Sequence, residues 1–246
     1  MASTSSGSHG TEEEWMNLQH EEVSELEQAA AEAKKGQKDD HQLTQLIHKI
    51  VQHFQDHTNK RTRLARIHVS PFFAPTSGTS LENSVKWIGG CRPASFIRFM
   101  YALSGMDLES KLTDFLRGKK FDDLGKLTSK QMNMIDALQA NTIKEEKKLS
   151  SRLASLQEDI VDHPIASKIK DEVGECGNVD EALDEHSRRM AGVLEEADEL
   201  RMKTLKEIVL NILKPAQAVE YLAAAKKMKL CFREWGKNRD QIQKDE

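Results

Sequence analysis

The sequence has 246 residues, of which 38% are apolar and 31% are charged. Its 36 basic and 40 acidic residues give a net charge of −4 at pH 7, which does not favour binding of nucleic acid by overall charge alone. Apolar residues are too frequent for a chain disordered throughout. No apolar run is long enough for a membrane span or a secretory signal, so we expect neither.

Three cysteines, Cys91, Cys176 and Cys231, are widely spaced and form no C-x-x-C pair. A disulfide framework or a zinc ribbon would need an even or paired set. We therefore expect reduced thiols.

The first part of the chain predicts a tail and two helices. Residues 1–10 are small and polar, which is typical of a flexible tail. Thr11 and Glu14 form a capping-box pattern that predicts the start of a helix ending near residue 34. After Asp39, apolar residues recur every three or four positions, and this spacing predicts a long amphipathic helix that ends before Pro71.

The middle of the chain is broken by prolines and glycines. Residues 70–80 read as an ordered loop, and Ser80 can cap a short helix that Gly89-Gly90 interrupts. Pro93 suits the first turn of a largely apolar helix. A further helix is predicted from Asp107 to Gly118.

Two long helices are predicted at about 129–161 and 179–213, and a last helix follows Pro215. Strand-type alternation is missing from the pattern. We therefore predict an all-α fold, a single bundle of about eight helices over residues 11–240, with a short tail at 241–246.

Few patterns point to chemistry. His53 and His57 are one helical turn apart, a spacing that can bind a metal ion or haem iron if further ligands arrive. The alternative is a polar pair flanking the apolar stripe at Phe54. Glycine-rich phosphate loops and nucleophile elbows are missing from the sequence, so enzymatic activity is not expected.

The last predicted helix is basic and carries an aromatic anchor. Calmodulin-type partners bind helices of this kind, whereas the alternative is a terminal helix whose apolar face is docked and whose basic face is solvated. The candidate partner-binding residues are Lys226, Lys227, Lys229, Arg233 and Trp235.

Several longer strings resemble the plant Delay of Germination family, including the domain that forms the C-terminal half of TGA-type basic leucine zipper factors. The similarity covers nearly all of residues 12–240. It is carried by Glu14-Trp-Met-Asn-Leu-Gln19, by residues 81–105 with Trp87-Ile-Gly-Gly-Cys-Arg-Pro93 within them, and by Ser155-Leu-Gln-Glu-Asp-Ile160. It is also carried by Glu196-Ala-Asp-Glu-Leu-Arg-Met-Lys-Thr-Leu205, Ile212-Leu-Lys-Pro-Ala-Gln-Ala218 and Arg233-Glu-Trp-Gly236. Within it, we assign a structural role to Trp87, Gly89, Gly90, Arg92 and Pro93.

This resemblance implies a non-enzymatic plant regulator of seed dormancy, germination and abscisic-acid responses, located in the nucleus and also in the cytoplasm. It implies self-association and action through protein partners, including type 2C protein phosphatases. Alternatives are a transcriptional cofactor that reaches DNA through a basic leucine zipper partner, without direct DNA contact, and a haem- or calmodulin-responsive sensor. Trp15, with Glu14 and Leu18, is the candidate N-terminal partner site, or else Trp15 holds the first helix on the bundle.

Two departures from the family pattern matter. Glu12 and Glu13 replace the aromatic and aliphatic residues that are tied to phosphatase binding in the dormancy regulator. Lys229 and Arg233 occupy the positions that align with that relative's haem-ligand histidines. Neither side chain can ligate iron at neutral pH, so we expect no cofactor.

Overall fold

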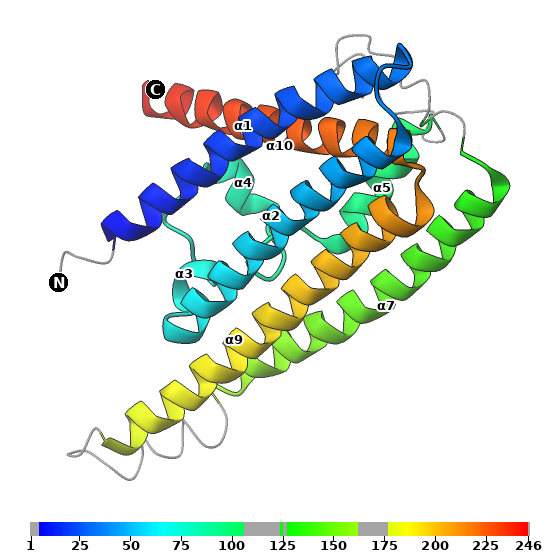
Figure 1. Ribbon diagram of the computed structural model, residues 1–246. Helices are drawn as coiled ribbons and strands as arrows, with labels where there is room; N and C mark the ends of the chain where they lie inside the picture. Colours follow the sequence, from blue (N-terminus) through cyan, green and yellow to red (C-terminus); the bar gives the residue numbers. More distant parts are fainter. Residues whose placement is uncertain (1–4, 106–123, 125–126, 162–176, 246) are drawn as a thin grey trace.

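The computed structural model describes residues 5–105, 124, 127–161 and 177–245, and within these ranges the chain is all-α (Figure 1). The predicted fold class is thereby confirmed. The predicted helix at 107–118 lies outside the described residues. Eight α-helices and one π-helical segment are described, and their bounds are α1 Ser5–Lys34, α2 Asp40–Ile67, α3 Ser70–Phe73, α4 Ser80–Ser84, α5 Pro93–Leu103, α7 Ser129–Glu158, α9 Gly177–Lys206, η2 Glu207–Ile212 and α10 Pro215–Asp245.

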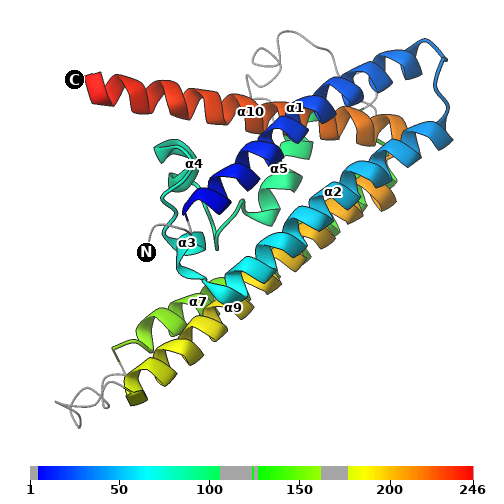
Figure 2. The ribbon, with the colours of Figure 1, turned by 60° about the vertical axis from the view of Figure 1, so that its left-hand side comes forward.

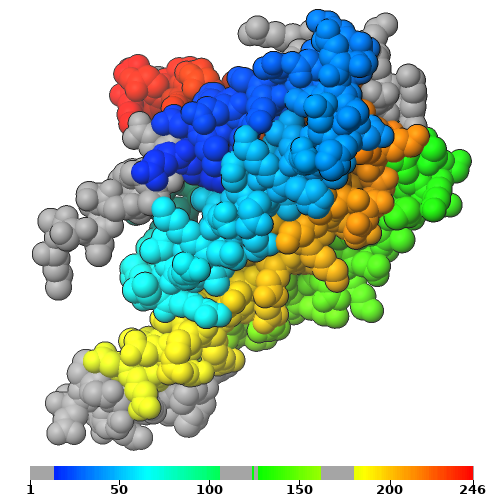
Figure 3. Space-filling model, viewed as in Figure 1, coloured from blue at the N-terminus to red at the C-terminus, as the bar shows by residue number. Residues whose placement is uncertain are grey.

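The long helices form two groups. α2, α7 and α9 run side by side along the length of the molecule, whereas α1 and α10 pair with each other across one end (Figures 1 and 2). The space-filling view shows α1 and α2 covering one face, with α9 and then α7 beside α2 (Figure 3). The α7–α9 pair extends beyond the other described helices.

Two apolar clusters hold this arrangement together. The larger joins α5 and η2 to all five long helices, and its fully buried members include Leu26, Ile50, Met100, Ile208 and Tyr221. The smaller lies where α7 and α9 meet the segment around Ile88. Burial of this apolar surface is the main driving force that brings the helices together.

The helix ends follow the chain's own capping residues. Asp39 caps α2 by accepting a hydrogen bond from the backbone of Gln42, whose side chain bonds back to Asp39. Thr128 and Gln131 form the same reciprocal box at the start of α7. Pro93 opens α5, as its sequence position predicts.

Four details differ from the prediction. α1 begins at Ser5, ahead of the Thr11 capping box, and α10 continues to Asp245 rather than ending near 240. The predicted loop at 70–80 contains a short helix, α3, which begins with Pro71 in its first turn. Thr79 rather than Ser80 caps α4.

The π-helical segment η2 continues α9 without a break. Its last amide bond runs from the N–H of Leu213 to the carbonyl of Ile208, five residues back, at 3.0 Å. Ile208, Val209 and Ile212 remain buried through this wider turn. Among the helices of the described residues, none combines the length and apolar character needed to cross a membrane.

Gly236 lets α4 approach α10 closely. A Cβ built at Gly236 would overlap the side chain of Thr79, the residue that caps α4. The contact is supported by a hydrogen bond from the Ser80 N–H to Asp240 Oδ2 at 3.0 Å and by an ion pair between Arg233 and Glu82 at 3.6 Å. α4 is therefore attached to the outer half of α10 by contacts that require a small residue at position 236.

Gly236→Ala should lower the free energy of unfolding by about 1–3 kcal/mol because Thr79 must move. Gly192→Ala is the matched control, since a Cβ there meets nothing within 4 Å. Ala is the better helix former, so this control should raise stability by about 0.5–1 kcal/mol. Urea denaturation compares the two, and an equal effect of both substitutions would contradict the close approach.

Candidate functional site

The turn between α4 and α5 is held by one buried arginine of α9. The Nε of Arg201 donates to the carbonyl of Cys91 at 2.7 Å, and its Nη2 donates to the carbonyls of Trp87 and Ile88, the latter at 2.8 Å. Its Nη1 pairs with Asp198 one turn earlier on α9. Burial lowers the pKa of Arg201, against the opposing effect of Asp198.

A second arginine, Arg61 of α2, holds the same turn, and we call Arg201, Arg61 and Asp198 together the clamp. Arg61 Nε donates to Asp198 Oδ2 at 2.9 Å, and Arg61 Nη1 donates to the carbonyl of Gly89 at 2.7 Å. Asp198 thus bridges both guanidinium groups. Four carbonyls of one turn are satisfied by two side chains that are far away in sequence, which ties α2, α9 and the turn together.

The backbone of this turn is strained, and the hydrogen bonds from Arg201 and Arg61 can maintain its conformation. Ile88 has a φ of +43°, a conformation that a β-branched residue rarely adopts, and Gly89 has a φ of +65°. A Cβ at Gly90 would lie 2.8 Å from Cζ of Arg201. The two glycines therefore allow the tight turn and the close approach of the guanidinium group.

Residues next to the turn attach it to α7. Trp87 Nε1 donates to Ser150 Oγ at 2.9 Å. Glu146 accepts from Arg92 Nε at 2.8 Å and from the backbone N–H of Ala94 at 2.6 Å, so it caps the start of α5. Trp87, Gly89, Gly90, Arg92 and Pro93 all contribute to this internal joint or open the helix that follows it.

Trp15 lies inside the molecule, with only 9% of its surface exposed. Its ring stacks on His57 at 4.0 Å and contacts the edge of Phe54 at 5.5 Å. Leu18 is half-buried and Glu14 is exposed. This geometry agrees with the alternative role of Trp15, in which the ring holds the first helix on the bundle, since Trp15 fixes α1 on α2.

Lys226 is also buried, with 2% of its surface exposed, and it does not belong to the solvated face of α10. Its Nζ donates to Glu22 Oε2 and to Gln19 Oε1, the latter at 2.8 Å, and lies 4.2 Å from the centre of the Phe54 ring. Burial lowers the pKa of Lys226 to about 8, although Glu22 opposes the shift.

The two histidines of the predicted ligand pair have different partners. His53 Nδ1 lies 2.6 Å from Glu22 Oε1, and His57 stacks on Trp15. Burial lowers the pKa of His57 to about 4, assisted by the charges of Lys229 and Arg61. No group of three or more His, Cys, Asp or Glu side chains in the described part of the chain is arranged to hold a metal ion.

The outer half of α10 is the exposed part of the predicted basic helix, and Figure 2 shows it extending past α1. Trp235 and Ile242 are 43% and 61% exposed, and seven residues of separation place them on one helix face. Exposed basic residues of α10 include Lys229, Lys237 and Arg239, and Arg239 lies on the face of Trp235 because it follows it by four residues. Lys227 and Arg233 instead pair with Glu27 and Glu82.

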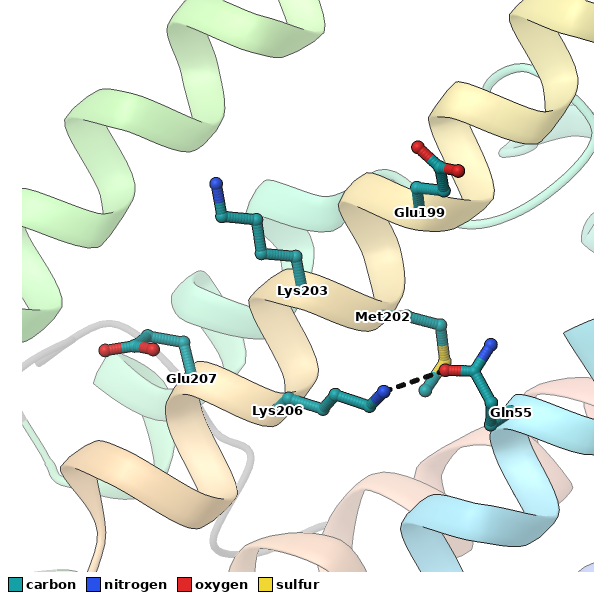
Figure 4. Close-up of a pocket in the computed structure, with 6 residues that line it drawn as sticks. All are labelled: Gln55, Glu199, Met202, Lys203, Lys206 and Glu207. Atoms are coloured by element: carbon teal, nitrogen blue, oxygen red, sulfur yellow. Dashed lines mark hydrogen bonds between the residues drawn. The ribbon is translucent and has the colours of Figure 1, made fainter.

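A shallow depression of about 360 Å³ lies between α2 and α9 (Figure 4). Met202 and the stems of charged side chains line it, and Lys206 donates to Gln55 across it at 2.8 Å. Its other lining residues are Glu199, Lys203 and Glu207. Because both signs of charge line it in similar number, it has no clear preference for an anion or a cation.

Comparison with known proteins identifies the class of helical protein. The family model for seed dormancy control, DOG1, matches residues 22–102. Protein DOG1-like 1 of Arabidopsis thaliana is 40% identical over 92% of this chain and 88% of its own length. Protein DOG1-like 3 of the same plant is 37% identical over 97% of this chain and 89% of its own length.

The chain therefore belongs to the DOG1 family. A more distant relative from Arabidopsis thaliana, Protein RESPONSE TO ABA AND SALT 1, is 26% identical over 78% of this chain and 76% of its own length. The family model spans the end of α1 to α5, and so includes Arg61 and the clamped turn.

Arg201→Lys should lower the free energy of unfolding by about 3 kcal/mol, because an ammonium group cannot reproduce the geometry of the guanidinium bonds to three carbonyls. Arg66→Lys is the control, since Arg66 pairs with Glu195 at the surface and should leave stability unchanged. Thermal and urea unfolding measure both. Equal stability of the two variants would contradict the clamp.

Stability should depend on His57 in acid. The unfolded chain binds a proton to this imidazole near its ordinary pKa of 6.5, whereas the folded chain binds it only near pH 4. The contribution is therefore fully present above pH 6.5 and is lost as pH falls to 4, by at most roughly 3 kcal/mol. His57→Gln should remove this component from urea unfolding curves recorded between pH 7 and 4, and an identical pH slope in both proteins would exclude it.

Proposed function

We propose that this protein is a non-enzymatic regulator of seed dormancy and germination that acts in abscisic-acid-linked responses through contacts with other proteins. The observation that carries the proposal is its membership of the DOG1 family along nearly its whole length. The name of the relative RESPONSE TO ABA AND SALT 1 supports the link to abscisic acid. We propose the nucleus as its main location, on the family resemblance.

The outer half of α10 is the proposed contact surface. Trp235 and Ile242 present apolar area beside the exposed Arg239, and exposed aromatic anchors often provide much of the affinity of a protein interface. The signature residues around Trp87, in contrast, are engaged in internal bonds. This division supports a structural role for the signature and a binding role for α10.

Type 2C phosphatases, calmodulin and basic leucine zipper factors remain the candidate partners that the sequence suggests. A basic helix with an aromatic anchor suits calmodulin-type recognition, although burial of Lys226 leaves fewer cations on its surface than the sequence indicates. In the alternative function, the protein reaches DNA through a basic leucine zipper partner. An electrophoretic mobility-shift assay distinguishes this indirect contact with DNA from direct binding. A salt-sensitive shift of DNA by the purified protein alone would contradict action purely through protein partners.

Substitution of the α10 surface should weaken partner binding. We expect Trp235→Ala combined with Ile242→Ala to lower affinity for a physiological partner at least tenfold without loss of thermal stability. Ile67→Ala on α2 is the control, because Ile67 is 83% exposed on another helix. Affinity purification from developing seed, with quantitative mass spectrometry, compares the partners of the three chains.

The same chains test the biological role in seeds that lack this protein. Wild type and Ile67→Ala should restore dormancy and the response to abscisic acid, and the α10 variant should not. Retention of all partners and full restoration by the α10 variant would contradict this contact surface. Unaltered germination in seeds without the protein would contradict the function itself.

A further inference from the structure

The described helices that contact α10 pack on particular sides of it. An α-helix turns by about 100° per residue, so the position of each residue around α10 can be given relative to Trp235. Lys226, which holds Glu22 of α1, lies nine residues earlier and so about 180° away. Gly236 and Asp240, which contact α4, lie about 100° and 140° away. These contacts with α1 and α4 therefore lie away from the side of Trp235.

The side of α10 that carries Trp235 combines exposed apolar residues with one cation. Ile242 and Arg239 lie within about 20° and 40° of Trp235 around the helix. Trp235 and Ile242 are 43% and 61% exposed, and Arg239 is exposed between them along the chain. Met228 and Phe232, which are half-buried, continue this side toward the bundle. We call Trp235, Arg239 and Ile242 the outer strip.

Arg239 differs from the basic residues of α10 that face α1 and α4. Lys226 and Lys227 pair with glutamates of α1, and Arg233 pairs with a glutamate of α4. For Arg239, the described part of the chain provides no acidic partner. A partner that covers the outer strip must therefore bring a group that compensates this guanidinium, because burial of an unpaired charge is costly.

The shape and charge of the outer strip favour an α-helix with a carboxylate as its partner. The strip is a ridge on a single helix, and a second helix can pack its side chains along such a ridge. Trp235 and Ile242 are one heptad apart, about 10 Å along the axis, which matches the repeat of a packed partner helix. A carboxylate accepts two parallel hydrogen bonds from a guanidinium group. Nucleic acid, in contrast, is held by many cations rather than one.

We propose that the outer strip binds an amphipathic helix of a partner protein, in which one Glu or Asp lies between two apolar residues and pairs with Arg239. This inference rests on the proposed function, in which α10 is the contact surface, and adds the chemistry of the partner. Trp235 and Ile242 supply most of the affinity, and Arg239 sets the specificity.

The test selects helices from a displayed library on the full chain. Each library member is a short helix of alanine and glutamine in which the positions of one face are randomised. The wild-type chain should enrich helices with two apolar residues one heptad apart and Glu or Asp between them. The Arg239→Glu chain should enrich Lys or Arg at the same position. The chain with both Trp235→Ala and Ile242→Ala should select neither.

Selected helices are then synthesised, and fluorescence anisotropy measures their affinities for each chain. Replacement of the helix carboxylate by Gln should weaken binding to wild type by at least about fivefold, and Arg239→Glu should weaken binding of the acidic helix by at least about tenfold. A Lys in place of that carboxylate should restore binding to the Arg239→Glu chain.

Lys237→Glu is the matched control for Arg239→Glu. It makes the same change of charge at an exposed position of the same helix, but Lys237 lies about 160° from Trp235. Lys237→Glu should therefore leave the affinity for the acidic helix unchanged. Circular dichroism and cooperative thermal unfolding establish that each chain is folded.

Four results would overturn the proposal. One is that no selected helix depends on Trp235 and Ile242. A second is selection without an acidic residue, or with the same residue on the wild-type and Arg239→Glu chains. A third is an equal effect of Arg239→Glu and Lys237→Glu, which would indicate general electrostatic attraction. A fourth is loss of a dimer in the chain without Trp235 and Ile242, seen by analytical ultracentrifugation, which would assign the strip to a second copy.

The selection and the seed experiments fail independently. If wild type restores dormancy but the library shows no preference for a carboxylate, the proposed function stands and the inferred chemistry of the partner is wrong. If germination is unaltered in seeds that lack the protein, the proposed function is contradicted whatever the library selects. A preference for a carboxylate that reverses with Arg239→Glu and is unaffected by Lys237→Glu supports the proposal.

Discussion

The Arg201 guanidinium group fixes the turn before α5 against α9 and, through Asp198, against α2, at the place where the smaller apolar cluster brings these three parts together. Its bonds to the carbonyls of Trp87, Ile88 and Cys91 hold a strained turn against α9, and Asp198 brings in Arg61 from α2. The turn in turn positions Arg92 and the start of α5 against Glu146 of α7. A planar group with several fixed donors suits this task, since a single ammonium cannot reach so many acceptors at once.

A second polar centre, around Lys226, has a different role. The Arg201 clamp joins backbone to side chain and so fixes the path of the chain, whereas Lys226 joins side chains of two separate helices. Loss of the first would disturb a turn that several helices share. Loss of the second would chiefly affect α1. The molecule therefore combines a central turn that several helices share with a contact between two helices, at Lys226, whose loss would affect mainly α1.

Much of the fold could be predicted from sequence because the signals are local. Asp39, Pro93 and Thr128 mark helix starts through their own side chains, and the three-four spacing of apolar residues identifies the long helices. Burial of Lys226 could not be predicted, because it depends on a carboxylate 204 positions earlier. In the sequence, Lys226 lies among other lysines, and this pattern indicates a solvated helix face unless α1 is known to lie beside it. Likewise, the π-helical segment η2 could not be predicted, because its wider turn leaves the spacing of apolar residues almost unchanged.

The distance along the chain between Glu22 and Lys226 has a consequence for biosynthesis. The two residues are 204 positions apart, so α1 emerges from the ribosome long before its partner exists. At about 5–20 residues per second, the face of α1 that α10 covers stays exposed for on the order of ten to forty seconds before α10 is made. Because Gln19 and Glu22 interrupt its apolar face, α1 of the nascent chain has a lower tendency to bind other exposed apolar surfaces than a fully apolar helix face would have. The same glutamate that fits Lys226 in the finished protein thus lowers the tendency of the nascent chain to aggregate.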